Sequence, residues 1–161
     1  MNNTIEIKQA QSTADFLVAK ALILEYTAWL GIDLSFQNFD AELATMPTTY
    51  GDSNGALFIV FNNNIPVGVA GIKRFSNHEC EVKRMFVQPS SRGLGIGEIL
   101  LTNCIQAAKK LNYSCIKLDT AGFMKSAIKL YTDNGFIEIP AYRHNPYEEA
   151  KFFELDFSKH P

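Results

Sequence analysis

The chain has 161 residues, 47% of them hydrophobic and 20% charged, with a formal net charge of −2 at pH 7. This composition is typical of a folded globular protein and excludes a disordered chain. The small net charge argues against broad binding to nucleic acid or to an anionic membrane surface.

The first half of the sequence predicts one strand, two helices and a β-hairpin from its hydrophobic periodicity and its capping residues. The strand covers residues 4–9, the helices cover 12–31 and 37–46 with Pro47 as the stop, and the hairpin joins 56–61 to 65–72. The hairpin connection is Asn62-Asn63-Asn64, and asparagine tolerates the positive φ that tight hairpin turns require.

The second half predicts strands that alternate with helices. The strands cover residues 80–87, 114–119, 136–139 and 151–157, and the helices cover 99–111 and 125–134, with Gly135 as the cap of the latter. The complete order is β-α-α-β-β-β-α-β-α-β-β. Hairpin-connected strands followed by βαβ units predict one domain, residues 1–161, of the α/β (mixed α+β) class with helices on both faces of a mixed sheet.

Cysteines, histidines and the start of the chain limit the function classes further. Three widely spaced cysteines and three scattered histidines match neither a disulfide framework nor a zinc pattern. The first residues lack the basic and apolar segments of a signal peptide, and no apolar run is long enough to span a membrane. We therefore expect a cytoplasmic protein with no metal, no nucleic-acid partner and no membrane contact.

The most informative segment is the glycine-rich turn Arg92-Gly93-Leu94-Gly95-Ile96-Gly97-Glu98, which connects a predicted strand to a predicted helix. Glycines let backbone N–H groups approach a ligand, and the first turn of a helix adds unpaired donors and a positive dipole end. Arg92 can add a charge-assisted contact. We interpret this turn as a cradle for a pyrophosphate.

Two other phosphate-binding motifs fit the turn less well. A P-loop needs Gly-Lys-Ser/Thr, but Glu98 and Ile99 follow Gly97. The dinucleotide fingerprint G-x-G-x-x-G fails by one position, although Asp119 stands near the place of the acid that would bind a ribose. A dinucleotide-binding redox protein therefore stays as the weaker alternative.

The turn and its flanks resemble the GNAT superfamily of acetyl-CoA-dependent N-acetyltransferases. Arg92–Gly97 matches the R/Q-x-x-G-x-G/A element, residues 81–89 match its E-x-x-x-x-x-V-x-P approach, and residues 130–136 match L-Y-x-x-x-G-F. The resemblance implies a mostly antiparallel sheet of six to seven strands with about four helices. It also implies transfer of an acetyl group from acetyl-CoA to an amine, and a homodimer formed through the C-terminal strands.

The resemblance implies which residues bind the coenzyme. The set comprises Met85, Phe86, Val87, Arg92, Gly93, Leu94, Gly95, Ile96, Gly97, Glu98 and Ser126. The backbone N–H groups of residues 85–87 would serve as oxyanion donors. One position departs from the family pattern, because Met124 stands where many members have an asparagine; Lys125 or Ser126 can substitute for it.

Two side chains are candidates for the proton transfers that amide formation needs. Tyr131 lies on an inward-facing helical stripe, and in similar enzymes this position protonates the sulfur; the alternative is an ordinary core tyrosine. Glu81 is the candidate general base. Its alternative is structural, because cross-strand ion pairs with Lys73 and Arg74 can account for both Glu79 and Glu81.

The acceptor amine is less well defined by the sequence. We expect its pocket to be lined by the first two helices, including Tyr26 and Trp29, and by the loop before the last strand. Arg84, Arg143 and His144 can bind a carboxylate, which predicts a small amino-acid-like amine. The alternative is that these three are solvated surface cations. A protein lysine stays open as an acceptor, and so does a non-catalytic acyl-CoA sensor.

Overall fold

Seven strands form a single sheet in the computed structural model, which describes residues 2–31, 33, 38–51 and 53–159. The strands are β1 (Ile5–Gln9), β2 (Ala56–Asn62), β3 (Ile65–Arg74), β4 (Glu79–Val87), β5 (Cys115–Ala121), β6 (Ile137–Ile139) and β7 (Ala150–Asp156). Their order across the sheet is β1-β2-β3-β4-β5-β7-β6, and every neighbouring pair is antiparallel except β4 and β5. The predicted mixed, mostly antiparallel α/β fold is confirmed.

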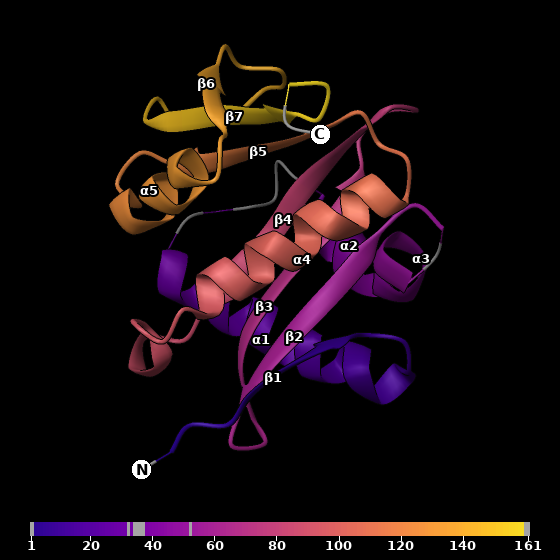
Figure 1. The fold of residues 1–161 in the computed structure, drawn as a ribbon, viewed down its shortest axis with the longest axis vertical. Coiled ribbons are helices and arrows are strands. Elements are labelled where there is room, and N and C mark those ends of the chain that lie inside the picture. The colour runs from indigo at the N-terminus through magenta and orange to yellow at the C-terminus, as the bar shows by residue number, and fades with distance from the viewer. Residues whose placement is uncertain (1, 32, 34–37, 52, 160–161) are drawn as a thin grey trace.

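Helices cover both faces of this sheet (Figure 1). They are α1 (Thr13–Leu30), α2 (Phe39–Ala44), α3 (Met46–Gly51), α4 (Ile96–Lys110) and α5 (Lys125–Asp133). On one face, Leu100 and Leu101 of α4 share a buried cluster with Tyr131 of α5. On the other, Ile23 of α1 and Tyr50 of α3 pack on Leu57 and other residues of the sheet. The described residues thus hold five α-helices and a short 3-10 helix at Pro89–Ser91, where the sequence predicted about four helices.

Local chemistry explains where the first elements begin and end. The Ser12 hydroxyl accepts from the Asp15 N–H at 3.1 Å and the Asp15 carboxylate accepts from the Ser12 N–H at 3.1 Å, so α1 starts in a capping box. Gly31 ends α1 with a φ of 67°. Asn63 and Asn64 have φ values of 52° and 67°, which confirms the predicted hairpin turn.

The helix predicted over residues 37–46 is wrong in its extent. The structure has two short helices instead, and Pro47 lies in the first turn of α3 rather than ending its predecessor. A proline fits there because the N–H groups of the first turn have no partner within the helix. Residue 37 lies outside the described residues.

The helix predicted from Ile99 begins three residues earlier, at Ile96. Gly95 is its N-cap, with a φ of 77°. Periodicity alone missed the first turn because glycines there interrupt the apolar stripe that marks a helix. The consequence for function is that the glycine-rich turn leads directly into the N-terminus of α4.

The strand β4 contains a bulge at its centre. Lys83 pairs with Gly71 of β3 but Phe86 pairs with Val69, so two residues of β4 oppose one residue of β3. Arg84 is one of the two bulged residues, and its φ of 59° is uncommon for a residue other than glycine. The bulge bends β4 away from regular pairing.

On its other side, β4 pairs with β5 over three residues only, and the ladder stops at Glu81 opposite Lys117. Beyond Glu81 the two strands diverge, as Figure 1 shows. Residues 86 and 87 pair with β3 on one edge of the strand, and beyond Glu81 the other edge of β4 faces the opening between β4 and β5.

Candidate active site

The glycine-rich turn lies at the end of the opening between β4 and β5. Gly93 and Gly95 both have positive φ, at 84° and 77°, and a side chain added at either would meet no atom within 4 Å. The turn is therefore fixed by backbone conformation and open toward its surroundings. Because no side chain caps α4, the N–H groups of its first turn remain available to an anion, which suits a pyrophosphate.

Arg92 is held beside this turn by contacts with two other elements. Its Nε donates to the Val87 carbonyl oxygen at 3.3 Å, and its guanidinium lies 4.6 Å from the centre of the Trp29 ring of α1. Ser126 lies exposed in the first turn of α5. The predicted coenzyme residues therefore come from β4, the glycine-rich turn and the start of α5.

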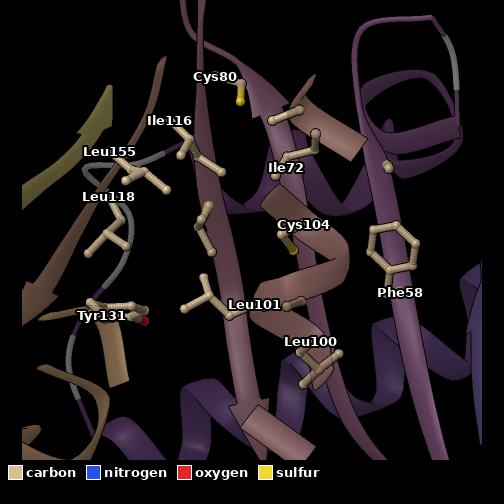
Figure 2. Close-up of a cluster of buried hydrophobic side chains, with 14 of the residues drawn as sticks. Phe58, Ile72, Cys80, Leu100, Leu101, Cys104, Ile116, Leu118, Tyr131 and Leu155 are labelled. Atoms are coloured by element: carbon tan, nitrogen blue, oxygen red, sulfur yellow. The ribbon is translucent and has the colours of Figure 1, made fainter. Parts of the chain in front are cut away.

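Tyr131 reaches the opening from the α4 and α5 side of the sheet. Its side chain is buried, and its hydroxyl lies 3.8 Å from the Met85 sulfur of β4. Figure 2 shows the hydroxyl turned away from Leu118 and Leu155, toward the middle of the cluster. Burial, followed by the nearby Tyr26 hydroxyl, raises the pKa of Tyr131 above its ordinary value. The phenol therefore stays protonated at neutral pH, as a proton donor must.

Tyr26 and Tyr131 lie on helices that cover opposite faces of the sheet. Burial raises the pKa of both phenols, and the Asp119 carboxylate of β5 acts in the same direction on each. A molecule seated in this opening would be within reach of groups from both faces.

Glu81 is the last residue of β4 that pairs with β5, so its carboxylate lies where the opening begins. The side chain is buried, and its Oε2 accepts a hydrogen bond from the Tyr142 hydroxyl at 2.8 Å and from Arg143 Nη2. Arg143 Nη2 also contacts Asp119 Oδ1 at 3.3 Å. A basic residue from a distant loop therefore bridges two carboxylates on adjacent strands.

Sequence reasoning proposed different partners for the glutamates of β4. Lys73 instead lies 4.0 Å from Glu42, and Arg74 bonds to asparagine side chains. The Glu79 carboxylate pairs with Lys117 at 3.2 Å, across the parallel ladder to β5. The structural alternative for Glu81 was therefore right that an ion pair exists and wrong about the partner.

Arg84 is not a solvated surface cation. Its side chain is 3% exposed, and its Nε donates to Glu42 Oε2 of α2 at 2.6 Å. Its guanidinium also lies 4.7 Å from the centre of the Phe39 ring. The adjacent Lys83 is buried too, and burial lowers its pKa to about 8, although the charge of Glu81 acts in the opposite direction.

The other predicted acceptor residues are spread along one side of the site. Tyr26 and Trp29 of α1 contact the Phe86 ring at centroid distances of 5.6 and 6.2 Å. His144 is exposed, in contrast to its neighbour Arg143. The structure thus brings Tyr26, Trp29 and Arg143 to the neighbourhood of β4 and leaves His144 facing solvent.

Of the residues that contact these charged groups, the sequence analysis missed Glu42, and it included Tyr142 and Asn145 only as part of the loop expected to line the acceptor pocket. Asn145 donates to Asp119 Oδ2 at 3.2 Å, so Asp119 has two partners from one loop. Glu42 and Tyr142 carried no motif, and only the loop segment containing Tyr142 had been singled out. Their contacts span 42 and 61 positions in sequence, which no local pattern can reveal.

In the part of the chain that the structure describes, no helix is both long and apolar enough to cross a bilayer. No group of three or more His, Cys, Asp or Glu side chains in that part is placed to hold a metal ion.

Comparison with known proteins gives a consistent result. A family model described as "Acetyltransferase (GNAT) family" matches residues 22–136. An uncharacterized N-acetyltransferase of Schizosaccharomyces pombe is 36% identical over 155 residues, which cover 95% of this chain and 93% of that protein. The crystal structure of a GNAT-family acetyltransferase from Staphylococcus aureus superposes with a TM-score of 0.78 at 26% identity, covering 95% of this chain and 99% of that one.

A further solved structure contains the acyl donor. A Bacillus anthracis protein assigned as a streptothricin acetyltransferase, solved in complex with acetyl coenzyme A, has a TM-score of 0.58 at 27% identity. The match covers 65% of this chain and 63% of that one. The fold, the splayed strands and these likenesses define an acetyltransferase.

The chain belongs to the GNAT family of acetyltransferases. This assignment replaces the dinucleotide-binding alternative, whose glycine spacing the sequence does not meet. The family uses acetyl-CoA, and the open glycine-rich turn at the start of α4 fits the pyrophosphate of that molecule.

Proposed function

We propose that this protein transfers the acetyl group of acetyl-CoA to the primary amine of a small, amino-acid-like acceptor. The observation that carries the proposal is the opening between β4 and β5, which Tyr131 approaches from one face and Glu81 from its closed end. A proton donor and a proton acceptor thus flank one site beside the glycine-rich turn. A sensor that only bound an acyl-CoA would need neither.

The acceptor must reach the reaction as a neutral amine, although a free amine of the lysine type has a pKa of about 10.4. Glu81 is the candidate base that takes this proton on its carboxylate. Acetyl-CoA, when bound, supplies a thioester carbonyl that is activated for attack by the amine. The backbone N–H groups of residues 85–87 are the candidates to stabilise the charge that develops on the carbonyl oxygen.

Tyr131 is the candidate general acid. Its phenol keeps its proton at neutral pH, because burial raises its pKa. Its hydroxyl can therefore give a proton to the departing thiolate sulfur. Met85, which now lies next to that hydroxyl, belongs to the same predicted coenzyme-binding segment of β4.

Arg143 is the best candidate among the predicted cations for contact with an acidic group of the acceptor. It lies beside Glu81 and its side chain is 22% exposed, whereas Arg84 is 3% exposed and held by Glu42. Tyr26 and Trp29 would form the apolar wall of the acceptor pocket. An acidic amine would thus meet a base for its ammonium and a cation for its carboxylate.

The experiment has two stages, of which the first is calorimetric titration with acetyl-CoA and, in parallel, NADH. We expect acetyl-CoA alone to bind, and binding to be lost in Gly95→Glu, where a carboxylate enters the anion cradle. The second stage measures coenzyme A release with L-aspartate and with putrescine, which has no carboxylate. Turnover that favours L-aspartate supports the proposed acceptor class, and turnover that favours putrescine contradicts it.

A further inference from the structure

One stretch of the loop between β6 and β7 supplies hydrogen-bond donors to two buried carboxylates. The Tyr142 hydroxyl and Arg143 Nη2 both donate to Glu81 Oε2, and Asn145 Nδ2 donates to Asp119 Oδ2. Arg143 Nη2 also reaches Asp119 Oδ1. Residues 142–145 are therefore fastened to β4 and β5 at the closed end of the opening.

Tyr142 differs from its neighbours in this stretch because its ring is fixed independently of its hydroxyl. The ring packs edge-on against Phe75 at 5.1 Å and against Phe152 at 5.4 Å between centroids. A phenylalanine at this position would keep both contacts. Its hydroxyl, by contrast, has Glu81 as its hydrogen-bond partner, so the loss of the hydroxyl removes one defined interaction from the candidate base.

We propose that Tyr142 is a positioning residue for Glu81, whose phenol hydrogen bond fixes the Oε2 atom and favours the charged, proton-accepting form of the carboxylate. The inference rests on the proposed function and deepens it. A carboxylate that accepts a hydrogen bond is stabilised in its ionised form. Arg143 acts in the same sense: its Nη2 contacts both Glu81 and Asp119, and its side chain also interacts with that of Tyr142.

The Tyr142 hydroxyl remains protonated at neutral pH. Burial, followed by the charges of Glu81 and Asp119, raises the pKa of its phenol above the ordinary value, so the hydroxyl remains a donor. The other titratable or charged groups that face Glu81 lie on every element around it. They are Tyr50 of α3, Lys73 of β3, Cys80 and Lys83 of β4, Lys117 and Asp119 of β5, and Arg143.

The test compares Tyr142→Phe with a matched control, Tyr147→Phe. Tyr147 lies in the same loop and also donates its hydroxyl, but to the Asp33 carbonyl oxygen at 3.0 Å. Both variants lose one hydroxyl and keep an aromatic ring. Thermal unfolding and circular dichroism of each variant establish that the fold is retained.

The first readout follows the carboxyl carbons of ¹³C-labelled glutamates by NMR across the acid pH range. The Glu81 resonance is the one that disappears in Glu81→Gln. In Tyr142→Phe we expect its titration midpoint to lie about one pH unit higher, the shift that loss of one hydrogen bond to a charged group produces. An unchanged midpoint overturns the inference, and a shift of equal size in Tyr147→Phe also overturns it.

The second readout is the pH dependence of kcat/KM with acetyl-CoA and whichever probe amine, L-aspartate or putrescine, is turned over faster. We expect the acid limb of this profile to move upward by the same amount in Tyr142→Phe and to stay in place in Tyr147→Phe. A wild-type protein that acetylates neither amine would contradict the proposed function. The NMR midpoint would still decide whether Tyr142 controls Glu81, so the two failures are distinguishable.

Discussion

The ion pair between Glu42 and Arg84 makes a quantitative prediction about stability. The two side chains are 1% and 3% exposed, and they join α2 to the bulge of β4. Removal of one partner from a buried pair costs about 3–5 kcal/mol, since the remaining charge is left without compensation. Glu42→Gln keeps the volume of the side chain and one acceptor oxygen, so we expect a loss at the lower end of this range, about 3 kcal/mol.

Urea denaturation followed by circular dichroism measures this cost. With a denaturant slope of about 2 kcal/mol per M for a chain of this size, the midpoint should fall by about 1.5 M. The control is Asp133→Asn, which removes a carboxylate from an exposed pair with Lys129 whose side chains are 58% and 75% exposed. That change should cost less than about 0.5 kcal/mol, or about 0.25 M in the midpoint.

A double variant separates the pair from its surroundings. In Glu42→Gln with Arg84→Gln the buried charges of residues 42 and 84 are both removed, so the free energy of unfolding should recover part of what Glu42→Gln loses. Both versions of residue 84 carry a side chain at a φ of 59°, so backbone strain stays the same. If Glu42→Gln and Asp133→Asn have the same midpoint, the reasoning from burial is refuted.

Three further predictions concern single groups. Tyr131→Phe should lower kcat about 10²-fold or more while acetyl-CoA affinity by calorimetry stays within a few-fold, because a proton donor is lost and the ring is kept; unchanged kcat would remove Tyr131 from the mechanism. Asp15 has a pKa held well below its usual range by Lys8 and then by backbone N–H groups, so its stabilising effect is present at neutral pH and fades as the pH falls below the unfolded value of 3.8. Chemical denaturation of Asp15→Asn and wild type should therefore show a gap at pH 7 that narrows toward pH 2, and a constant gap would contradict this. Lys83 has a pKa lowered by burial to about 8, so between pH 8 and 10.5 the unfolded chain binds more protons than the folded chain. The free energy of unfolding of wild type should therefore rise with pH over this window relative to that of Lys83→Met. If the two free energies change in parallel with pH, Lys83 is not desolvated.

Local signals in the sequence were enough to predict most of the fold. The capping serine, the paired asparagines and Gly31 each act within a few residues, so their positions predict where elements begin and end. The boundaries of α2, α3 and α4 were less predictable. A proline in a first turn and glycines at a helix start break the hydrophobic pattern without ending the helix.

The site was predictable only where it is encoded in contiguous residues. The glycine-rich turn and Tyr131 belong to short motifs, so both could be identified in the sequence, and the structure confirms that Tyr131 faces inward. The partners of Glu81 and Arg84 come from residues about 40 to 60 positions away, and they depend on how the sheet brings separate loops together. Asp119 was noticed in the sequence as a ribose-binding acid, but the structure pairs it with Arg143 and Asn145.

The bulge of β4 changes which side chains lie on each face of the sheet: odd-numbered and even-numbered residues exchange faces across it. Before it, odd-numbered residues such as Lys83 point to the α1 side; after it, the even-numbered Phe86 does, and Met85 and Val87 turn to the side of α4 and α5. One strand can therefore present its base to one layer and its coenzyme-facing segment to another. Deletion of residue 84 would turn the side chain of every later residue of β4 to the opposite face of the sheet. The number of residues in this strand is therefore as tightly constrained as their identity.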